Sequence, residues 1–237
     1  MDLLLLSNST LPGEPFLQWP RQHIVEFLGP PPKKIAFVPF AAVSFSMDEY
    51  THIVQGAFAD MGHELFSLHT GTDKVKALEG ADAVAVGGGN SFQLLRTLYS
   101  TELVRAIRRK VQSGMPYIGW SAGSNVACPT IMTTNDMPIT EVPTLRAMGL
   151  IPYQINPHYT DVKLDGHGGE TRDQRLNEFL ALNQRVAVVG LREGSGLVVH
   201  NDRTELIGRA MRLFRHGSEP VEVPEGSAFR TDLSDLN

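Results

Sequence analysis

The chain has 237 residues, a formal net charge of −5, and hydrophobic and charged contents of 42% and 20%. This length suits one large α/β domain, and we expect a single catalytic domain over residues 1–237. The acidic balance argues against a nucleic-acid-binding surface, because non-specific binding to nucleic acid needs a basic face.

The cysteine content and the apolar runs bear on the compartment. The single cysteine, Cys128, cannot form a disulfide within the chain, which indicates a reducing compartment. The apolar run at residues 3–6 is too short for a signal sequence, and no other run reaches the length of a membrane span. We therefore expect a cytoplasmic protein that binds neither a membrane nor nucleic acid.

Apolar runs without polar alternation predict strands that are buried on both faces of a sheet. They lie at residues 3–6, 34–38, 64–68 and 83–86, in the run that ends at Trp120, and at residues 185–189. Amphipathic segments predict helices at residues 17–28, 47–61, 73–78, from 92 onward, at 102–111 and at 170–182. Ser46 and Glu49 have the form of a capping box, and Ser91 is expected to cap the helix that follows it.

This alternation of strands and helices predicts a mostly parallel sheet covered on both faces, that is, a three-layer α/β/α sandwich. Short broken segments after residue 196 predict antiparallel additions at the C-terminal edge. Residues 129–169 are irregular, polar and interrupted by prolines, and loops of this length in an α/β domain commonly carry a site.

Ser121 stands in the sequence Gly119-Trp120-Ser121-Ala122-Gly123, which has the G-x-S-x-G form of a nucleophile elbow. A sharp turn from strand to helix leaves no room for a side chain two positions before or after the serine. The frame therefore predicts that Ser121 presents its hydroxyl group at the end of a sheet strand, where it can act as a nucleophile.

A nucleophilic serine needs a base, and His158 is the best placed of the eight histidines. It follows Asn156 and Pro157 in a segment downstream of the serine, and the proline restricts the backbone just before the ring. Most of the other histidines lie in expected helices, beside a strand or in late hairpins, which indicates packing or surface roles.

Two carboxylates compete to orient the ring of His158. Asp136 lies between the serine and the histidine and gives the order Ser, Asp, His that α/β hydrolases show. Glu193 follows an expected strand end, a usual place for catalytic side chains in such sheets. We favour Asp136 as the third catalytic residue and keep Glu193 as the alternative.

The run Gly87-Gly88-Gly89-Asn90 comes directly before an expected helix. We expect the backbone N–H groups of Gly88, Gly89 and Asn90 to hold an oxyanion or a substrate carboxylate. A phosphate loop is not indicated, since the run has neither a G-K-[ST] ending nor G-x-G-x-x-G spacing.

Nitrogen and oxygen ligands gather at His158, Asp161, Asp165, His167 and Glu170. They lack the tight spacing of a zinc site, so we interpret them as solvated loop residues and expect no metal.

Arg172 lies at the start of an expected helix, where the helix macrodipole disfavours a positive charge. Two explanations stay open. The guanidinium either forms an ion pair within the helix or binds a substrate carboxylate in a bidentate fork.

A series of motifs runs in order from the N-terminus to about residue 194. They are LLLLSNST at residues 3–10, DEYT at 48–51, VGGGN at 86–90, GWSAG at 119–123, TTNDMPI at 133–139, NPH at 156–158 and GETR at 169–172. With these motifs the chain resembles the peptidase E family of α-aspartyl dipeptidases, in the serine peptidase group (family S51) that also includes cyanophycinases. The segment after residue 199 matches only loosely.

The resemblance implies hydrolysis of dipeptides with an N-terminal aspartate, on a fold similar to class I glutamine amidotransferases. It implies Ser121 as the nucleophile, His158 as its base and Arg172 as the residue that reads the aspartate side chain of the substrate. The third catalytic residue of the family has been described at the positions of both Asp136 and Glu193, so that choice stays open. No metal or organic cofactor is implied, a small peptide is the expected partner, and a homodimer would suit the family.

Other functions fit parts of the pattern. A cyanophycinase-like hydrolase of β-aspartyl-arginine polymers would share the elbow, and a catalytically silent protein could use Arg172 to capture acidic peptides. A glutamine amidotransferase is disfavoured, because the nucleophile position holds serine and not cysteine.

Overall fold

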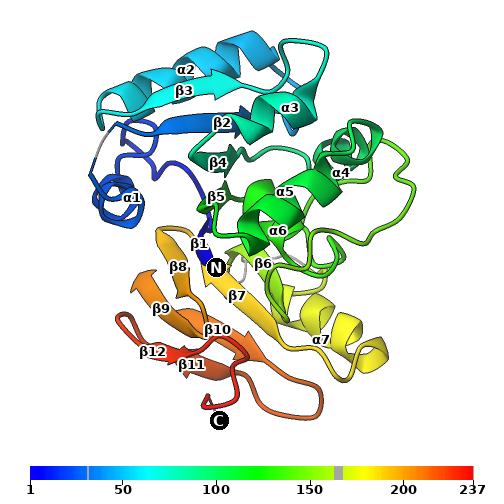
Figure 1. Ribbon diagram of the computed structural model, residues 1–237. Coiled ribbons are helices and arrows are strands. Elements are labelled where there is room, and N and C mark those ends of the chain that lie inside the picture. The colour runs from blue at the N-terminus through cyan, green and yellow to red at the C-terminus, as the bar shows by residue number, and fades with distance from the viewer. Residues whose placement is uncertain (31, 163–167, 237) are drawn as a thin grey trace.

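Two sheets form the centre of the computed structural model, which describes residues 1–30, 32–162 and 168–236 (Figure 1). In this part of the chain the larger sheet has eight strands, in the order β12-β9-β8-β1-β5-β4-β2-β3. Its parallel strands are β1 (Asp2–Leu6), β5 (Tyr117–Trp120), β4 (Ala83–Val86), β2 (Lys34–Val38) and β3 (Glu64–Ser67). The strands that extend the β1 edge in antiparallel fashion are β8 (Ser195–His200), β9 (Arg203–Gly208) and β12 (Ala228–Arg230).

Helices cover both faces of the parallel strands, as Figure 1 shows with α1 on one side and α5 and α6 on the other. The helices on one face are α1 (Arg21–Leu28) and α2 (Met47–Ala59). Those on the other face are α3 (Lys74–Glu79), α4 (Ser91–Ser100), α5 (Leu103–Gln112) and α6 (Ala122–Ala127). In β1, Leu3 and Leu5 pack against the second group while Leu4 and Leu6 pack against the first, and all four are fully buried. The predicted three-layer sandwich is confirmed.

A second sheet adjoins the first and has the strand order β11-β10-β7-β6. Its strands are β6 (Gln154–Tyr159), β7 (Val188–Arg192), β10 (Met211–Phe214) and β11 (Val221–Val223), of which β6 and β7 are parallel. Helix α7 (Arg172–Leu182) packs on this sheet through Leu176 and Leu180. The C-terminal strands are antiparallel as predicted, but they are divided between the two sheets. No helix in the described ranges has both the length and the apolar character that crossing a membrane requires.

The helix starts follow from their capping residues. Ser46 accepts a hydrogen bond from the N–H of Glu49, and the Glu49 carboxylate accepts one in return, so the predicted capping box is confirmed. The cap of α4 is Asn90, whose side chain accepts bonds from the two amides after Ser91. The expectation that Ser91 would cap this helix was therefore wrong, because Ser91 is already its first residue.

The turn between β5 and α6 brings backbone segments into close contact. A Cβ atom on Gly123 would lie 2.0 Å from the carbonyl oxygen of Val86, and one on Gly119 would lie 2.6 Å from the carbonyl oxygen of Gly123. Neither position can accept a side chain without displacement of the backbone. The two glycines of the elbow frame are thus required by the packing of α6 against β4 and β5.

Gly123→Ala should destabilise the fold by about 3 kcal/mol, because α6 must move away from β4 to admit the methyl group. Gly56 provides the matched control, since it lies in α2 and a Cβ atom there would have no neighbour within 4 Å. Gly56→Ala should stabilise the protein by about 0.5–1 kcal/mol through helix propensity. Urea unfolding measures both changes, and a Gly123→Ala protein as stable as the unsubstituted one would contradict the packing argument.

Candidate active site

Ser121 occupies the turn between β5 and α6. Its φ of 53° and ψ of −113° lie in a region that residues with side chains seldom adopt. The N–H of Ser121 donates to the carbonyl oxygen of Leu6 at 3.1 Å, which attaches the turn to β1. The sharp strand-to-helix turn that the sequence frame predicts is therefore present.

His158 lies within β6, at a position where the register with β7 is irregular. Its φ is 53°, and its N–H donates to Oγ of Ser7 at 2.9 Å. These constraints turn the ring toward the serine, so that Nε2 lies 2.8 Å from Oγ of Ser121. The structure thus brings together the two residues that the sequence analysis paired.

Glu193, directly after β7, faces the other ring nitrogen of His158. Its Oε1 lies 2.7 Å from Nδ1, and the two side chains are 39% (His158) and 46% (Glu193) exposed. A carboxylate in this place favours the tautomer with the proton on Nδ1, which leaves Nε2 free to accept the proton of the serine hydroxyl. Ser121, His158 and Glu193 therefore form a hydrogen-bonded chain with the geometry of a catalytic triad.

Asp136 does not occupy the orienting position that we favoured for it. Its Oδ2 accepts hydrogen bonds from the N–H of Ser91 at 2.7 Å and from Oγ1 of Thr134 at 3.0 Å. Nδ1 of His158 pairs with Glu193 instead, so the preference for Asp136 does not match the geometry. The physical reason is strand pairing. β7 lies parallel to β6, so Glu193, the residue that follows β7, lies beside His158.

The side chains of Ser121, His158 and Glu193 line a cleft of about 470 Å³. Its apolar wall consists of Phe16, Phe45, Tyr50 and Trp120. Burial raises the pKa of Tyr50, so its hydroxyl stays protonated at neutral pH, and it accepts a hydrogen bond from Nε1 of Trp120 at 2.8 Å. These four side chains are therefore uncharged, and the carboxylates among the described lining residues are those of Asp136 and Glu193.

The residues of the glycine loop differ in their relation to the cleft. Gly88 and Gly89 line the cleft, and a Cβ atom on Gly88 would lie 3.0 Å from Cβ of Ser121. The N–H of Asn90 donates to the carbonyl oxygen of Ala41 at 2.9 Å, while its side chain caps α4. Asn90 is thus engaged in the fold, and the expectation that its N–H binds an anion does not match the structure.

Arg172 is the first residue of α7, where Thr171 is the cap. Its NH1 donates to Oδ1 of Asn135. The ion pair at this helix start joins Arg175 to Glu170 at 3.7 Å, and no carboxylate in the described ranges lies within 4.0 Å of the Arg172 guanidinium. Burial, and then the nearby charge of Arg175, lowers the pKa of Arg172. The structure therefore does not support an ion pair within the helix as the explanation for Arg172.

Of the residues considered above as possible metal ligands, those that the structure describes do not form a cluster. Asp165 and His167 lie outside the described residues. Asp161 pairs with Arg192 at 3.0 Å, and His158 belongs to the hydrogen-bonded chain above. Within the part of the chain that the structure describes, no three His, Cys, Asp or Glu side chains gather in a metal-binding arrangement.

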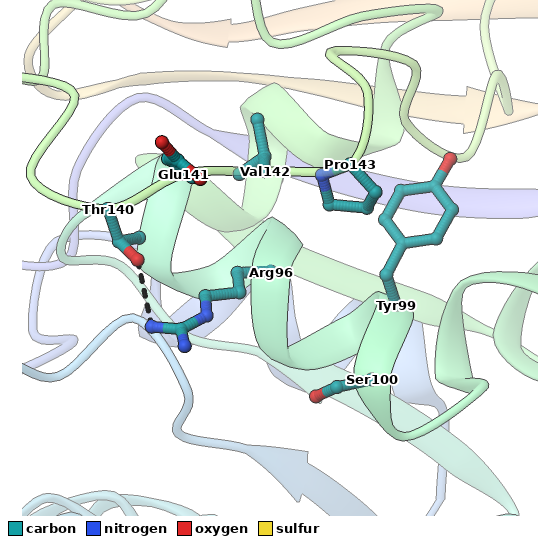
Figure 2. Close-up of a pocket in the computed structure, with 7 residues that line it drawn as sticks. All are labelled: Arg96, Tyr99, Ser100, Thr140, Glu141, Val142 and Pro143. Atoms are coloured by element: carbon teal, nitrogen blue, oxygen red, sulfur yellow. Dashed lines mark hydrogen bonds between the residues drawn. The ribbon is translucent and has the colours of Figure 1, made fainter.

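A second hollow, of about 760 Å³, lies between α4 and residues 140–143 (Figure 2). There NH1 of Arg96 donates to Oγ1 of Thr140 at 2.8 Å, and this bond holds the loop against the helix. Of the described residues that line the hollow, Glu141 is the one carboxylate and none is a histidine. The hollow offers no pairing of nucleophile and base.

Two polar residues that support the site were missed in the sequence. The hydroxyl of Ser7 donates to the carbonyl oxygen of Leu191 and accepts the N–H of His158, and Asn135 holds Arg172. A polar residue directly after a fully buried strand is a signal that could have identified Ser7. Asn135 lies in the TTNDMPI motif, but the local sequence gives it no role, because its contacts come from segments distant along the chain.

The description "Peptidase family S51" belongs to a family model that matches residues 3–207. The chain belongs to peptidase family S51. Family S51 relatives named peptidase E, from Nostoc sp. and Streptomyces coelicolor, are each 50% identical to it. The first match covers 93% of this chain and 91% of the relative, and the second covers 100% and 95%. Membership in family S51 makes the protein a serine peptidase, and these matches do not favour the cyanophycinase-like or silent-binding alternatives.

A solved structure shares the fold of this member of family S51. A peptidase from an acI-B1 actinobacterium has a TM-score of 0.69 at 18% identity, over 97% of this chain and 96% of that one.

Glu193→Gln should lower the rate at which Ser121 reacts with a fluorophosphonate by about 10³-fold, because an amide admits the wrong tautomer of His158. The matched control is Glu141→Gln, which removes a carboxylate from the second hollow and should leave the rate unchanged. The labelling rate is followed by intact-protein mass spectrometry. Unchanged labelling of the Glu193→Gln protein would exclude Glu193 as the orienting group.

Proposed function

We propose that this protein is a serine dipeptidase that hydrolyses dipeptides with an N-terminal aspartate. The observation that carries the proposal is the chain of hydrogen bonds from Ser121 through His158 to Glu193, at 2.8 and 2.7 Å. The relatives named peptidase E support it, and a cleft of about 470 Å³ suits a small peptide.

In the proposed mechanism His158 takes the proton of Ser121 as the hydroxyl oxygen attacks the scissile carbonyl. The carboxylate of Glu193 stabilises the imidazolium that forms, and backbone N–H groups near Gly89 and after Ser121 hold the oxyanion. His158 then protonates the leaving amine, and water hydrolyses the acyl-enzyme. Each of these steps uses side chains and amides of this chain.

Arg172 is proposed to supply the preference for aspartate. Its guanidinium is partly buried, is held by Asn135, and has no carboxylate partner among the described residues. Binding of the β-carboxylate of the substrate would offset the cost of this burial. A substrate without that carboxylate would leave the guanidinium unpaired. This penalty discriminates between substrates more strongly than the attraction to the carboxylate does.

We also propose that the enzyme acts in the cytoplasm on small peptides. The chain has one cysteine, and Cys128 is buried, so no disulfide contributes to the fold. A fold that uses no disulfide suits a reducing compartment.

Ser121→Ala should reduce kcat for Asp-Leu by about 10⁵-fold or more while the protein remains folded, because the variant lacks the attacking oxygen. Asp-Leu, Glu-Leu, Asn-Leu and β-Asp-Leu are assayed side by side with the unsubstituted enzyme, and Asp-Leu should have the highest kcat/KM. A higher value for β-Asp-Leu would contradict the proposed substrate. Binding of Asp-Leu without any turnover would contradict the proposed activity.

Arg172→Ala should lower kcat/KM for Asp-Leu by about 10²-fold, through loss of the bond to the β-carboxylate, and should barely change residual cleavage of Leu-Leu. Arg175→Ala is the matched control, because Arg175 lies on the same helix turn but pairs with Glu170. Equal losses on the two substrates would place Arg172 in the fold and not in recognition.

A further inference from the structure

The carboxylate of Glu193 has one hydrogen-bond partner among the described residues, Nδ1 of His158 at 2.7 Å. Its side chain is nearly half exposed, so neighbouring atoms restrict its conformation only in part. The place of the carboxylate therefore depends on the main chain that carries it. Glu193 and Gly194 form the short connection between β7 and β8, and the groups that hold this connection decide where the carboxylate lies.

The connection passes from the smaller sheet, which contains β7, to the larger sheet, which contains β8. The N–H of Gly194 donates to Oδ1 of Asn8 at 2.9 Å, and the carbonyl oxygen of Gly194 accepts the N–H of Arg209 at 3.1 Å. Gly194 has a φ of 77°, which glycine adopts without strain. In the part of the chain that the structure describes, Asn8 is the one side chain that bonds to the main chain of residues 193 and 194.

The carboxamide of Asn8 is itself held in one orientation. Asn8 is buried, its Nδ2 donates to the carbonyl oxygen of Thr10 at 2.8 Å, and its own carbonyl oxygen accepts Nε1 of Trp19 at 3.2 Å. A carboxamide has a donor on one side and an acceptor on the other, so the bond to Thr10 determines that the oxygen faces Gly194. The acceptor that Gly194 meets is therefore fixed in both place and direction.

We propose that Asn8 is a positioning residue of the active site and acts through Glu193. Its Oδ1 holds the N–H of Gly194 and so fixes the point from which the Glu193 carboxylate reaches Nδ1 of His158. Asn8 forms no hydrogen bond with the side chains of Ser121, His158 or Glu193, so its contribution passes through the connection. The proposal rests on the proposed function, because it assumes that these three side chains activate the serine.

Two consecutive residues after β1 thus hold the two partners of one bond. Oγ of Ser7 accepts the N–H of His158, and Oδ1 of Asn8 accepts the N–H of Gly194, the residue after Glu193. Without its acceptor the buried N–H of Gly194 would be unpaired, so the connection would shift toward another partner. A shift of about 1 Å takes a carboxylate out of hydrogen-bond range of an imidazole and is enough to cost about 10²-fold in rate.

The test uses Asn8→Ala and Asn8→Leu, which both remove the acceptor. Leucine is close to asparagine in shape, so Asn8→Leu removes the bonds without leaving a cavity, and thermal unfolding verifies that each variant is folded. Both should lower the rate at which a fluorophosphonate labels Ser121 by about 10- to 100-fold. Both should lower kcat for Asp-Leu by a similar factor and change KM by less than about threefold. Trp19→Phe is the control, because it removes a bond to the main chain of Asn8 but leaves Oδ1 in place, and it should change the labelling rate by less than about threefold.

The same substitutions are then made in the Glu193→Gln protein. A residue that acts through the Glu193 carboxylate has little left to position there, so Asn8→Leu should lower the remaining labelling rate by less than about threefold. A residue that only maintains the fold of the cleft would lower the rate by the same factor in both proteins. Equal losses in the two proteins would therefore overturn the proposal.

The positioning role and the dipeptidase activity fail in different ways, because labelling of Ser121 needs no dipeptide. Unchanged labelling of Asn8→Leu, when Glu193→Gln is slow, would overturn the role of Asn8 and leave both the role of Glu193 and the hydrolysis of Asp-Leu intact. Labelling rates that follow the expected pattern, together with no hydrolysis of Asp-Leu by the unsubstituted protein, would contradict the dipeptidase activity alone.

Discussion

The hydroxyl group of Ser7 joins the two sheets that carry the active site. It donates to the carbonyl oxygen of Leu191 at 2.7 Å and accepts the N–H of His158 at 2.9 Å, and the N–H of Ser7 donates to Ser195. Ser7 is fully buried, so these bonds form in an environment where an unpaired polar group is costly. Because Ser121 lies on the larger sheet and His158 on the smaller one, their separation depends on how this hydroxyl aligns the sheets.

The same strand also fixes Ser121. Backbone conformations such as that of Ser121 cost on the order of 1–3 kcal/mol and persist only where their surroundings compensate. Here the carbonyl oxygen of Leu6 accepts bonds from the N–H of Ser121 at 3.1 Å and from Oγ of Ser124 at 2.7 Å. Leu6 ends β1 and precedes Ser7, so two consecutive residues position both Ser121 and His158. The elbow is thus held by β1 as well as by the glycines that flank it.

The parts of this architecture that could be predicted are those with a local signal. Strands buried on both faces appear as apolar runs, and the elbow serine is marked by its glycines. The sequence shows a strand-like apolar run before Asn156, but it does not predict that β6 continues through Asn156 and Pro157 to Tyr159. The Asn156 side chain bonds to Asn135, and the strand continues past an irregular position at the histidine. Without β6 its pairing with β7 cannot be foreseen, and that pairing places Glu193, and not Asp136, beside Nδ1 of His158.

A contact between β6 and α7 sets the distance between His158 and Arg172, the residue proposed to bind the substrate carboxylate. His158 and Arg172 are followed in the chain by Tyr159 and Asp173, and the hydroxyl of Tyr159 donates to Oδ1 of Asp173 at 2.5 Å. Burial raises the pKa of Tyr159, so the hydroxyl stays protonated and remains a donor, while Arg212 neutralises the carboxylate at 3.3 Å. This bond attaches the first turn of α7 to β6. A long arginine side chain can discriminate between substrates only if its helix keeps a fixed position relative to the reacting atoms, and the buried tyrosine supplies that constraint.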